Sequence, residues 1–194
     1  EPMATIKHVS QPGGLAVNKN GDLFVSTPNG VQIFAPPYTG TPIGEVTNGV
    51  NQPNTVAFDS KSDLFVSNIG NSTITMYPPP YTGAPTVTIP NAQCYPRSLA
   101  FDARGDLFIG YYPKFQPPVN EVLEYAPPYT GAPIATITKD VNAPYGLAVD
   151  SSGNLFVADA VNSNVKAYAP PYTGAPFVTI TTGVDFPEGL AFGP

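Results

Sequence analysis

One stretch of thirteen residues is repeated along the chain, and it constrains the fold more than any other feature. The first copy covers residues 14–26 and reads Gly-Leu-Ala-Val-Asn-Lys-Asn-Gly-Asp-Leu-Phe-Val-Ser. Close copies begin at Thr55, Ser98 and Gly146, and Gly189–Phe192 repeats only the beginning. Repeats with a period of about 20–50 residues are typical of solenoids and propellers, so we expect a repeat architecture.

Each copy contains two short apolar runs joined by a polar turn, and runs of this composition predict β-strands. A third run such as Val31–Phe34 follows, then a Pro-Pro-Tyr-Thr-Gly segment, and then a fourth run such as Ile43–Val46. The Pro-Pro-Tyr-Thr-Gly segments begin 43, 48 and 43 residues apart. Four strands in a repeating unit of about 40–50 residues predict the blades of a β-propeller.

We therefore predict one all-β domain over residues 1–194, with four complete four-stranded blades plus terminal strands. Ala4–His8 matches a fourth strand and Gly189–Phe192 matches a first strand. Two architectures are compatible with these repeats: a closed ring of four blades and a segment of a larger propeller. We favour an incomplete ring or one that a partner completes, because unpaired strand edges seek partners. The repeats cover about residues 13–53, 54–96, 97–144 and 145–187.

The fourth copy has a more specific pattern. From Pro144 to Asp159 it reads Pro-x-Gly-Leu-Ala-Val-Asp-x-x-Gly-Asn-Leu-Phe-Val-Ala-Asp, and Asn162–Tyr168 follow. This pattern resembles the NHL repeat, and the resemblance covers nearly the whole chain. It implies a propeller used for protein or ligand binding and, in some members of the family, for metal-dependent lyase chemistry. The activity stays open because one scaffold hosts many functions.

Composition and charge exclude some partners. The net charge is −6 with only 8 Lys and Arg, so the chain offers no basic surface for nucleic acid. No apolar run approaches the ~20 residues of a membrane span. Few charged residues and the glycosylation sequon at Asn71 favour a secreted or extracellular protein. A single cysteine, Cys94, excludes a disulfide within the chain.

The residue after a recurring proline is expected at the mouth of the propeller channel. This position differs in every copy while its surroundings repeat, as on a recognition surface carried by a constant scaffold. Free drift of a loop position is the alternative. The residues concerned are Gly13, Asn54, Arg97, Tyr145 and Glu188, and we predict partner binding by Asn54, Arg97, Tyr145 and Glu188.

An insertion over residues 111–118 accounts for the longer spacing of 48 residues and is expected on the same face. Tyr111, Tyr112, Lys114 and Phe115 in this proline-stiffened loop are predicted to contact a partner, because aromatic side chains give large contact areas. The alternative is that the aromatic side chains fold back over the neighbouring blade.

Two other repeated elements have structural explanations. The turns that begin at Asp59, Asp102 and Asp150 are expected to be Asx turns, in which the side chain bonds the backbone, rather than calcium sites. In the Pro-Pro-Tyr-Thr-Gly segments, the prolines end the third strand and the glycine is expected to permit the reversal. The four tyrosines, such as Tyr38, are expected to pack on adjacent blades.

Together these features predict a non-catalytic binding or scaffold module that needs no cofactor. One alternative is a structural subunit that self-assembles with its own copies through terminal strands at open edges. Another is a metal-dependent propeller lyase or lactonase. The sequence gives that chemistry little support, because His8 is the only histidine and Glu188 the only carboxylate at a channel position.

Overall fold

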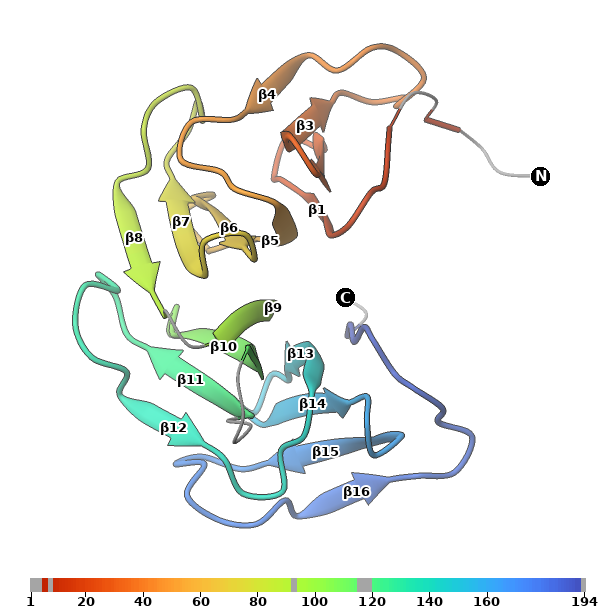
Figure 1. Ribbon diagram of the computed structural model, residues 1–194, viewed down its shortest axis with the longest axis vertical. Helices are drawn as coiled ribbons and strands as arrows, with labels where there is room; N and C mark the ends of the chain where they lie inside the picture. The colour runs from red at the N-terminus through yellow and green to blue at the C-terminus, as the bar shows by residue number, and fades with distance from the viewer. Residues whose placement is uncertain (1–4, 7–8, 92–93, 115–119, 193–194) are drawn as a thin grey trace. The chain divides into compact units, whose positions relative to one another are not determined.

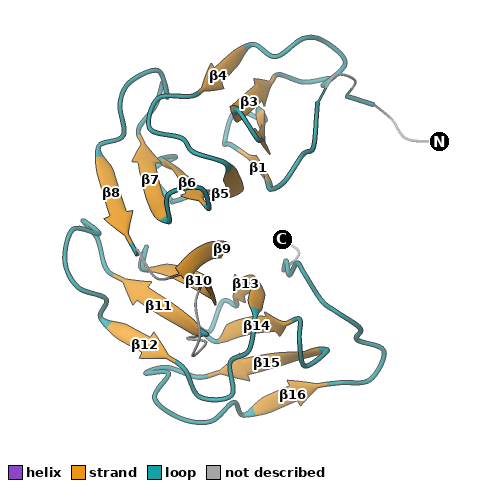
Figure 2. Cartoon of the chain, in the orientation of Figure 1, coloured by secondary structure: helices purple, strands orange, loops and turns teal. Residues whose placement is uncertain are grey.

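The computed structural model describes residues 5–6, 9–91, 94–114 and 120–192, and these residues form β-strands, turns and loops (Figures 1 and 2). Sixteen strands form four separate sheets, each of four antiparallel strands in sequence order. The prediction of an all-β fold with four complete four-stranded blades is therefore confirmed. None of the described residues lies in a helix, and so none is in a helix that could span a membrane.

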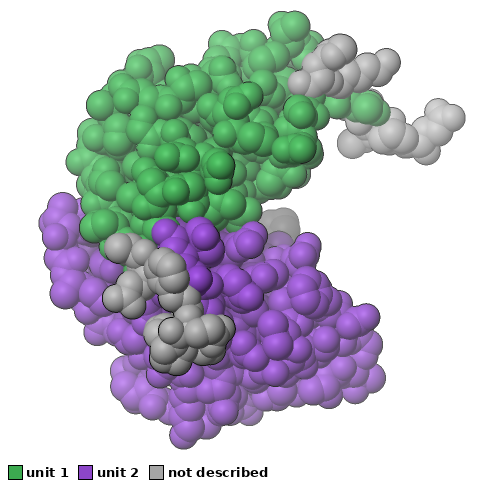
Figure 3. Space-filling view, in the orientation of Figure 1, with its two compact units in different colours: residues 1–92 green, residues 93–194 purple. Residues whose placement is uncertain are grey.

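The chain divides into two compact units, residues 1–92 and residues 93–194 (Figure 3). Unit 1 holds blades 1 and 2, and unit 2 holds blades 3 and 4. Blade 1 consists of β1 (Leu15–Val17), β2 (Leu23–Thr27), β3 (Gly30–Phe34) and β4 (Gly44–Val46). Blade 2 consists of β5 (Pro53–Phe58), β6 (Leu64–Asn68), β7 (Thr73–Tyr77) and β8 (Val87–Pro90). Blade 3 consists of β9 (Cys94–Phe101), β10 (Leu107–Pro113), β11 (Glu121–Tyr125) and β12 (Ala135–Ile137). Blade 4 consists of β13 (Pro144–Val149), β14 (Leu155–Asp159), β15 (Asn164–Tyr168) and β16 (Val178–Ile180).

The turn between the first two strands of every blade is closed by one side chain. In blade 2, Asp59 Oδ1 accepts hydrogen bonds from the backbone N–H groups of Lys61 at 2.9 Å and Asp63 at 2.8 Å. Asn18, Asp102 and Asp150 accept the same two bonds in the other blades. An Asx side chain that satisfies two backbone donors fixes the turn, and the prediction of Asx turns at these residues is confirmed.

The Pro-Pro-Tyr-Thr-Gly segment is also built alike in every blade. In blade 1 the Pro36–Pro37 peptide bond is cis, and Tyr38 N–H donates to the carbonyl of Ala35 at 2.9 Å. Tyr38 has a φ of 62°, whereas Gly40 is not in the left-handed region. The prediction that the glycine permits the reversal is therefore wrong: the reversal occurs at the two prolines, in a turn of type VI, and the left-handed tyrosine follows it.

The tyrosine hydroxyl of this segment bonds back to the Asx turn of its own blade. Tyr38 donates to the carbonyl of Gly21 at 2.8 Å, and Tyr172 donates to that of Gly153 at 2.7 Å. Tyr81 and Tyr129 make the same bond at 3.0 and 2.8 Å. The hydroxyl satisfies a turn carbonyl, so each blade is braced at this end by its own side chain.

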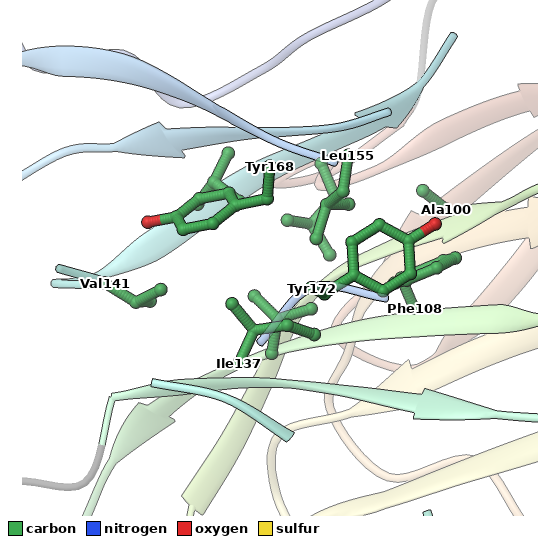
Figure 4. Close-up of a cluster of buried hydrophobic side chains, with 10 residues drawn as sticks. Ala100, Phe108, Ile137, Val141, Leu155, Tyr168 and Tyr172 are labelled. Atoms are coloured by element: carbon green, nitrogen blue, oxygen red, sulfur yellow. The ribbon is translucent and has the colours of Figure 1, made fainter. Parts of the chain in front are cut away.

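Within each unit, the two blades pack face to face through apolar side chains. In unit 1, the ring of Phe24 in blade 1 meets Phe58 and Tyr81 of blade 2 edge to face, with centroids 4.9 and 5.1 Å apart. In unit 2, Phe108 of blade 3 meets Tyr172 of blade 4 at 5.3 Å, surrounded by Ile137 and Leu155 (Figure 4). The prediction that these tyrosines pack on adjacent blades is confirmed for Tyr81 and Tyr172.

A serine hydroxyl also joins the blades of each unit. Ser26 Oγ donates to the carbonyl of Asn54 at 2.7 Å, and Ser98 Oγ donates to the carbonyl of Pro144 at 2.8 Å. Ser26 lies in β2, the second strand of its blade, whereas Ser98 lies in β9, the first strand of its blade. Blade 1 has Gly14 at the position of Ser98, and blade 3 has Gly110 at the position of Ser26. A Cβ on Gly14 would lie 2.7 Å from the Cα of Thr55, and one on Gly110 would lie 2.6 Å from the carbonyl oxygen of Pro144. The close approach of the blades therefore requires glycine there.

The expected terminal strands do not form in the described residues. Thr5 and Ile6 of the expected strand Ala4–His8 are in neither strand nor helix, and the same is true of Gly189–Phe192. The other residues of Ala4–His8 lie outside the described part. The reason is that the apolar pattern alone does not make a strand: the ladder needs a neighbouring strand to supply its hydrogen bonds. The prediction of a single domain over residues 1–194 stays a prediction.

Candidate functional site

The first two strands of blade 3 are longer than those of the other blades. β9 and β10 continue beyond a β-bulge at which β9 has one extra residue, Arg97, and Tyr112 pairs with Tyr95. A bulge adds a residue to one strand and turns the side chains that follow it. The extension places Tyr111 and Tyr112 of the insertion in β10, next to β13.

Four side chains of unit 2 meet at this place and form what we call the aromatic cluster: Arg97, Tyr112, Tyr145 and Phe186. Tyr145 is at the centre, because its ring meets Tyr112 edge to face at 5.7 Å and Phe186 at 6.0 Å. The guanidinium of Arg97 lies over the Tyr145 ring, 5.2 Å from its centroid. Such contacts hold partly exposed rings in fixed positions.

A second cation lies beside another ring of the same hairpin. The ammonium of Lys114 is 4.9 Å from the centroid of the Tyr95 ring, and both side chains are half-buried. Lys114 thus lies on β9–β10 as part of an ordered contact. This pair extends the aromatic and cationic character of the surface beyond the aromatic cluster.

The structure places the other predicted binding residues differently. Asn54 is half-buried in β5 of unit 1, where its carbonyl accepts hydrogen bonds from Gly14 N–H and Ser26 Oγ. Glu188 is exposed and follows Phe186 by two residues. Phe115 lies outside the described residues, as does His8. The roles of all these residues in binding stay predictions.

Tyr111 is the residue for which the predicted position is wrong. It is not in an exposed loop: it lies in β10 with its side chain fully buried, on the same face of the strand as the buried Leu107 and Ile109. Burial, with a contribution from neighbouring Tyr125, raises the pKa of its hydroxyl far above the ordinary value. Tyr111 is therefore a core residue of blade 3 and does not reach a partner.

Phe186 was not predicted as a site residue. It lies in the segment after β16, is 51% exposed and has a φ of 43°. Its N–H donates to Ser163 Oγ at 3.3 Å, which holds the segment against the β14–β15 turn. The repeat pattern does not predict an aromatic residue at Phe186, because the residue before the recurring proline varies among the copies. Its large apolar side chain next to Pro187 and Glu188 was the available signal.

One group of acidic side chains has the spacing of a metal site. Ligand oxygens of Asp102, Asp106 and Glu124 lie within 4.8 Å of one another. Arg104 stands among them and forms ion pairs with Asp102 at 2.9 Å, Asp106 at 3.0 Å and Glu124 at 3.2 Å. Burial, and then the neighbouring carboxylates, raise the pKa values of Asp106 and Glu124. The arginine accounts for this group as an ion-pair network of the blade 3 turn.

Unit 1 has a groove of ≈ 580 Å³ at the Asx-turn end of blades 1 and 2. Its apolar walls include Phe24, Ile33 and Tyr81, and Lys61 stands at the rim. Lys19 donates from the turn of blade 1 to the carbonyl of Ser60 in the turn of blade 2. The groove lies at the opposite end of the strands from the serine contacts between blades, so it is separate from the surface that the sequence predicts for binding.

Comparison with known proteins supports the fold. No family model matches the sequence, and no curated protein matches it. Among solved structures, a chain in "Crystal Structure of Mitotic Checkpoint Complex" is similar, with a TM-score of 0.65 and 15% sequence identity. The match covers 88% of this chain but only 51% of that one, so this chain spans about half the length of its neighbour. At this identity the likeness shows the fold alone: an all-β protein with propeller-type blades.

Proposed function

We propose that this protein is a non-catalytic binding module that recognises another protein through the aromatic cluster of unit 2. The observation that carries the proposal is the contact of Tyr145 with both Tyr112 and Phe186 under the guanidinium of Arg97. Tyrosine and arginine are the residues most enriched at the energetic centre of protein interfaces, and Phe186 adds apolar area. Rings already held in place lose little conformational entropy on binding.

The fold supports a protein partner. The similar solved chain belongs to a structure of a complex, and the NHL-like pattern from Pro144 to Asp159 points to a family of binding propellers. The finer assignment to NHL repeats is part of this proposal. The net charge of −6 leaves Arg97 and Lys114 as local cations on an acidic protein, which suits a partner segment with acidic groups beside apolar ones.

Two matched phenylalanines of unit 2 provide the test. Phe186 and Phe177 are 51% and 56% exposed, but only Phe186 belongs to the aromatic cluster. Proteins retained by the immobilised chain from an extract of its source are identified, and the affinity of each purified candidate is measured by calorimetry. We expect Phe186→Ala and Tyr145→Ala to weaken binding about ten-fold or more, and Phe177→Ala to leave it within about two-fold. Equal effects of Phe186→Ala and Phe177→Ala would contradict the proposal.

We also propose that the protein acts outside the cytoplasm. The sequon residue Asn71 is exposed in the β6–β7 turn, and Thr73 Oγ1 donates to its side-chain oxygen at 2.9 Å. An exposed turn is where a glycan on this asparagine is accommodated without disturbing the blade. Intact mass of the protein purified from its source, before and after deglycosylation, tests this: no change in mass removes the support from Asn71.

A further inference from the structure

Each blade has two apolar faces, one towards the blade before it and one towards the blade after it. We call the first the leading face and the second the trailing face. In both units a trailing face is covered by a leading face, and Ile137 of blade 3 and Leu147 of blade 4 are then only 1% and 6% exposed. The equivalent Ile180, on the trailing face of blade 4, is 43% exposed, and Leu15, on the leading face of blade 1, is 61% exposed.

These two partly exposed faces match an interface that already exists in unit 2. The trailing face of blade 4 has the same residue types as that of blade 3. It carries Ala148, Phe156, Val165 and Ile180 where blade 3 carries Ala100, Phe108, Val122 and Ile137. The leading face of blade 1 likewise matches that of blade 4. It carries Leu15, Val17, Leu23, Val25 and Tyr38 where blade 4 carries Leu147, Val149, Leu155, Val157 and Tyr172.

A short C-terminal segment covers part of the trailing face of blade 4. Phe192 meets Phe156 edge to face at 5.1 Å and 79°, as Phe58 meets Phe24 at 4.9 Å and 84° in unit 1. The carbonyl of Glu188 is also 3.0 Å from the place of a Cβ on Gly146, as that of Asn54 is 2.8 Å from one on Gly14. The segment thus takes the place of the first strand of a following blade, while Ile180 stays exposed.

We propose that the trailing face of blade 4 binds the leading face of blade 1 of a second copy, head to tail, and that residues 188–192 compete for the same face. The partner is apolar and of the same sequence, because the two faces carry the apolar residues of the blade 3–blade 4 interface at the nine positions named above. Two of its hydrogen bonds have no counterpart. Phe34 stands in place of Tyr168, which bonds the carbonyl of Lys139, and blade 4 has Gly146 where blade 3 has the bonding Ser98. The association is therefore weaker than the internal interface and depends on concentration.

A complementation experiment tests the direction of this contact. Leu15→Asp places a charge on one face and Ile180→Asp on the other, and both sites are exposed, so each variant folds. By light scattering over a concentration series, we expect each variant alone to be monomeric and their mixture to form a dimer of twice the 20.4 kDa monomer mass. Wild-type protein forms dimers and longer chains, because its contact is heterologous.

Two further variants complete the test. Ile134→Asp changes the same residue type at a 57% exposed position before β12, outside the face, and leaves self-association within about two-fold of wild type. Deletion of residues 185–194 removes the competing segment and strengthens self-association about ten-fold or more. A wild-type protein that stays monomeric at every concentration, with or without this segment, overturns the proposal. So does self-association that Leu15→Asp and Ile180→Asp leave unchanged.

Discussion

The interface between blades 1 and 2 in unit 1 and the interface between blades 3 and 4 in unit 2 have the same aromatic centre but different surroundings. Phe24 meets Tyr81 in unit 1 as Phe108 meets Tyr172 in unit 2. Beside them, unit 1 has Ile33 and an open groove, whereas unit 2 has Glu124 at the equivalent place, ion-paired to Arg104. Tyr81 stays half-exposed, while Tyr172 is buried and burial raises its pKa to about 12.

This difference shows that the side chains at the Asx-turn end of the interface are free to vary. The apolar contacts between the blades fix their packing, so the side chains at the Asx-turn end need only avoid an unpaired buried charge. Ile33 meets that condition by being apolar, and Glu124 meets it by pairing with Arg104. One scaffold therefore provides either a groove or a closed ion-pair network.

The largest effect is expected from emptying the aromatic centre. Phe108→Ala should lower the free energy of unfolding by about 3–5 kcal/mol, because Phe108 is fully buried against Tyr172. Phe24→Ala should fall at the low end of that range, since Phe24 lines the groove and water can fill the space. Urea denaturation of both variants measures the difference. Equal losses would show that the groove does not relieve the cavity.

Removing the arginine of unit 2 should have a smaller effect that depends on pH. Arg104→Ala leaves Asp106 and Glu124 without their cation, and we expect a loss of about 1–2 kcal/mol at pH 7. Their pKa values, already raised from 3.8 and 4.5, rise further in the folded state. Because the folded pKa is the higher one, stability falls as pH rises through it and returns below the unfolded pKa.

The loss should therefore shrink below about pH 4. Denaturation at several pH values measures this trend, and Lys61→Ala in unit 1 is the control, because its ammonium makes no ion pair within the described residues. A loss for Arg104→Ala that is the same at every pH would mean that the arginine acts through packing alone.

The tyrosine brace should show a smaller difference between the units. Tyr172→Phe removes the hydrogen bond to the carbonyl of Gly153, and Tyr81→Phe removes the one to Ser62. We expect a loss of about 1–1.5 kcal/mol for the first and about 0.5 kcal/mol for the second, because Tyr172 is buried, whereas Tyr81 lines the groove, where water can replace its hydroxyl. Thermal melting of the two variants side by side checks this order. The reverse order would mean that water replaces the lost hydroxyl more readily in unit 2 than in unit 1.

The smallest effect is expected from replacing the charged side chain at the Asx-turn end of unit 2 by an apolar one, as unit 1 has there. Glu124→Leu removes a buried carboxylate and supplies an apolar side chain, so its stability at pH 7 should stay within about 1 kcal/mol of wild type. Its stability should also vary less with pH, because Glu124 no longer titrates with a raised pKa. Denaturation at pH 5 and pH 7 compares the two proteins. A large loss would show that the network specifies the packing of unit 2.

Most of the fold could be predicted because the same local signals recur in every blade. The run Leu64–Asn68 and the turn at Asp59 illustrate this: apolar residues and an Asx side chain sit at fixed spacing, and both behave as their chemistry requires. The signals at the chain ends were weaker. Gly189–Phe192 has the residues of a strand but does not form one, because no neighbouring strand extends the ladder.

The candidate site could be predicted in part, and the misses have physical causes. Arg97, Tyr112 and Tyr145 lie together because the repeat fixes where each strand begins. Tyr111 is buried because the insertion extends β10, so Tyr111 continues the inward face of Leu107 and Ile109 instead of lying in a loop. Phe186 stands directly before a recurring proline, at a position that varies among the copies, so only the three-dimensional path of its segment shows that it reaches Tyr145.

The bond from Tyr38 to the carbonyl of Gly21 has a consequence for how such a chain grows and diverges. Tyrosine, turn and bonded carbonyl all belong to one blade, and this holds for each of the four blades. A duplicated gene segment of one blade length therefore encodes its own fastening and needs no compensating change in its neighbours. Only the apolar faces must continue to match, so blade number can change by duplication or loss while each blade keeps its internal structure.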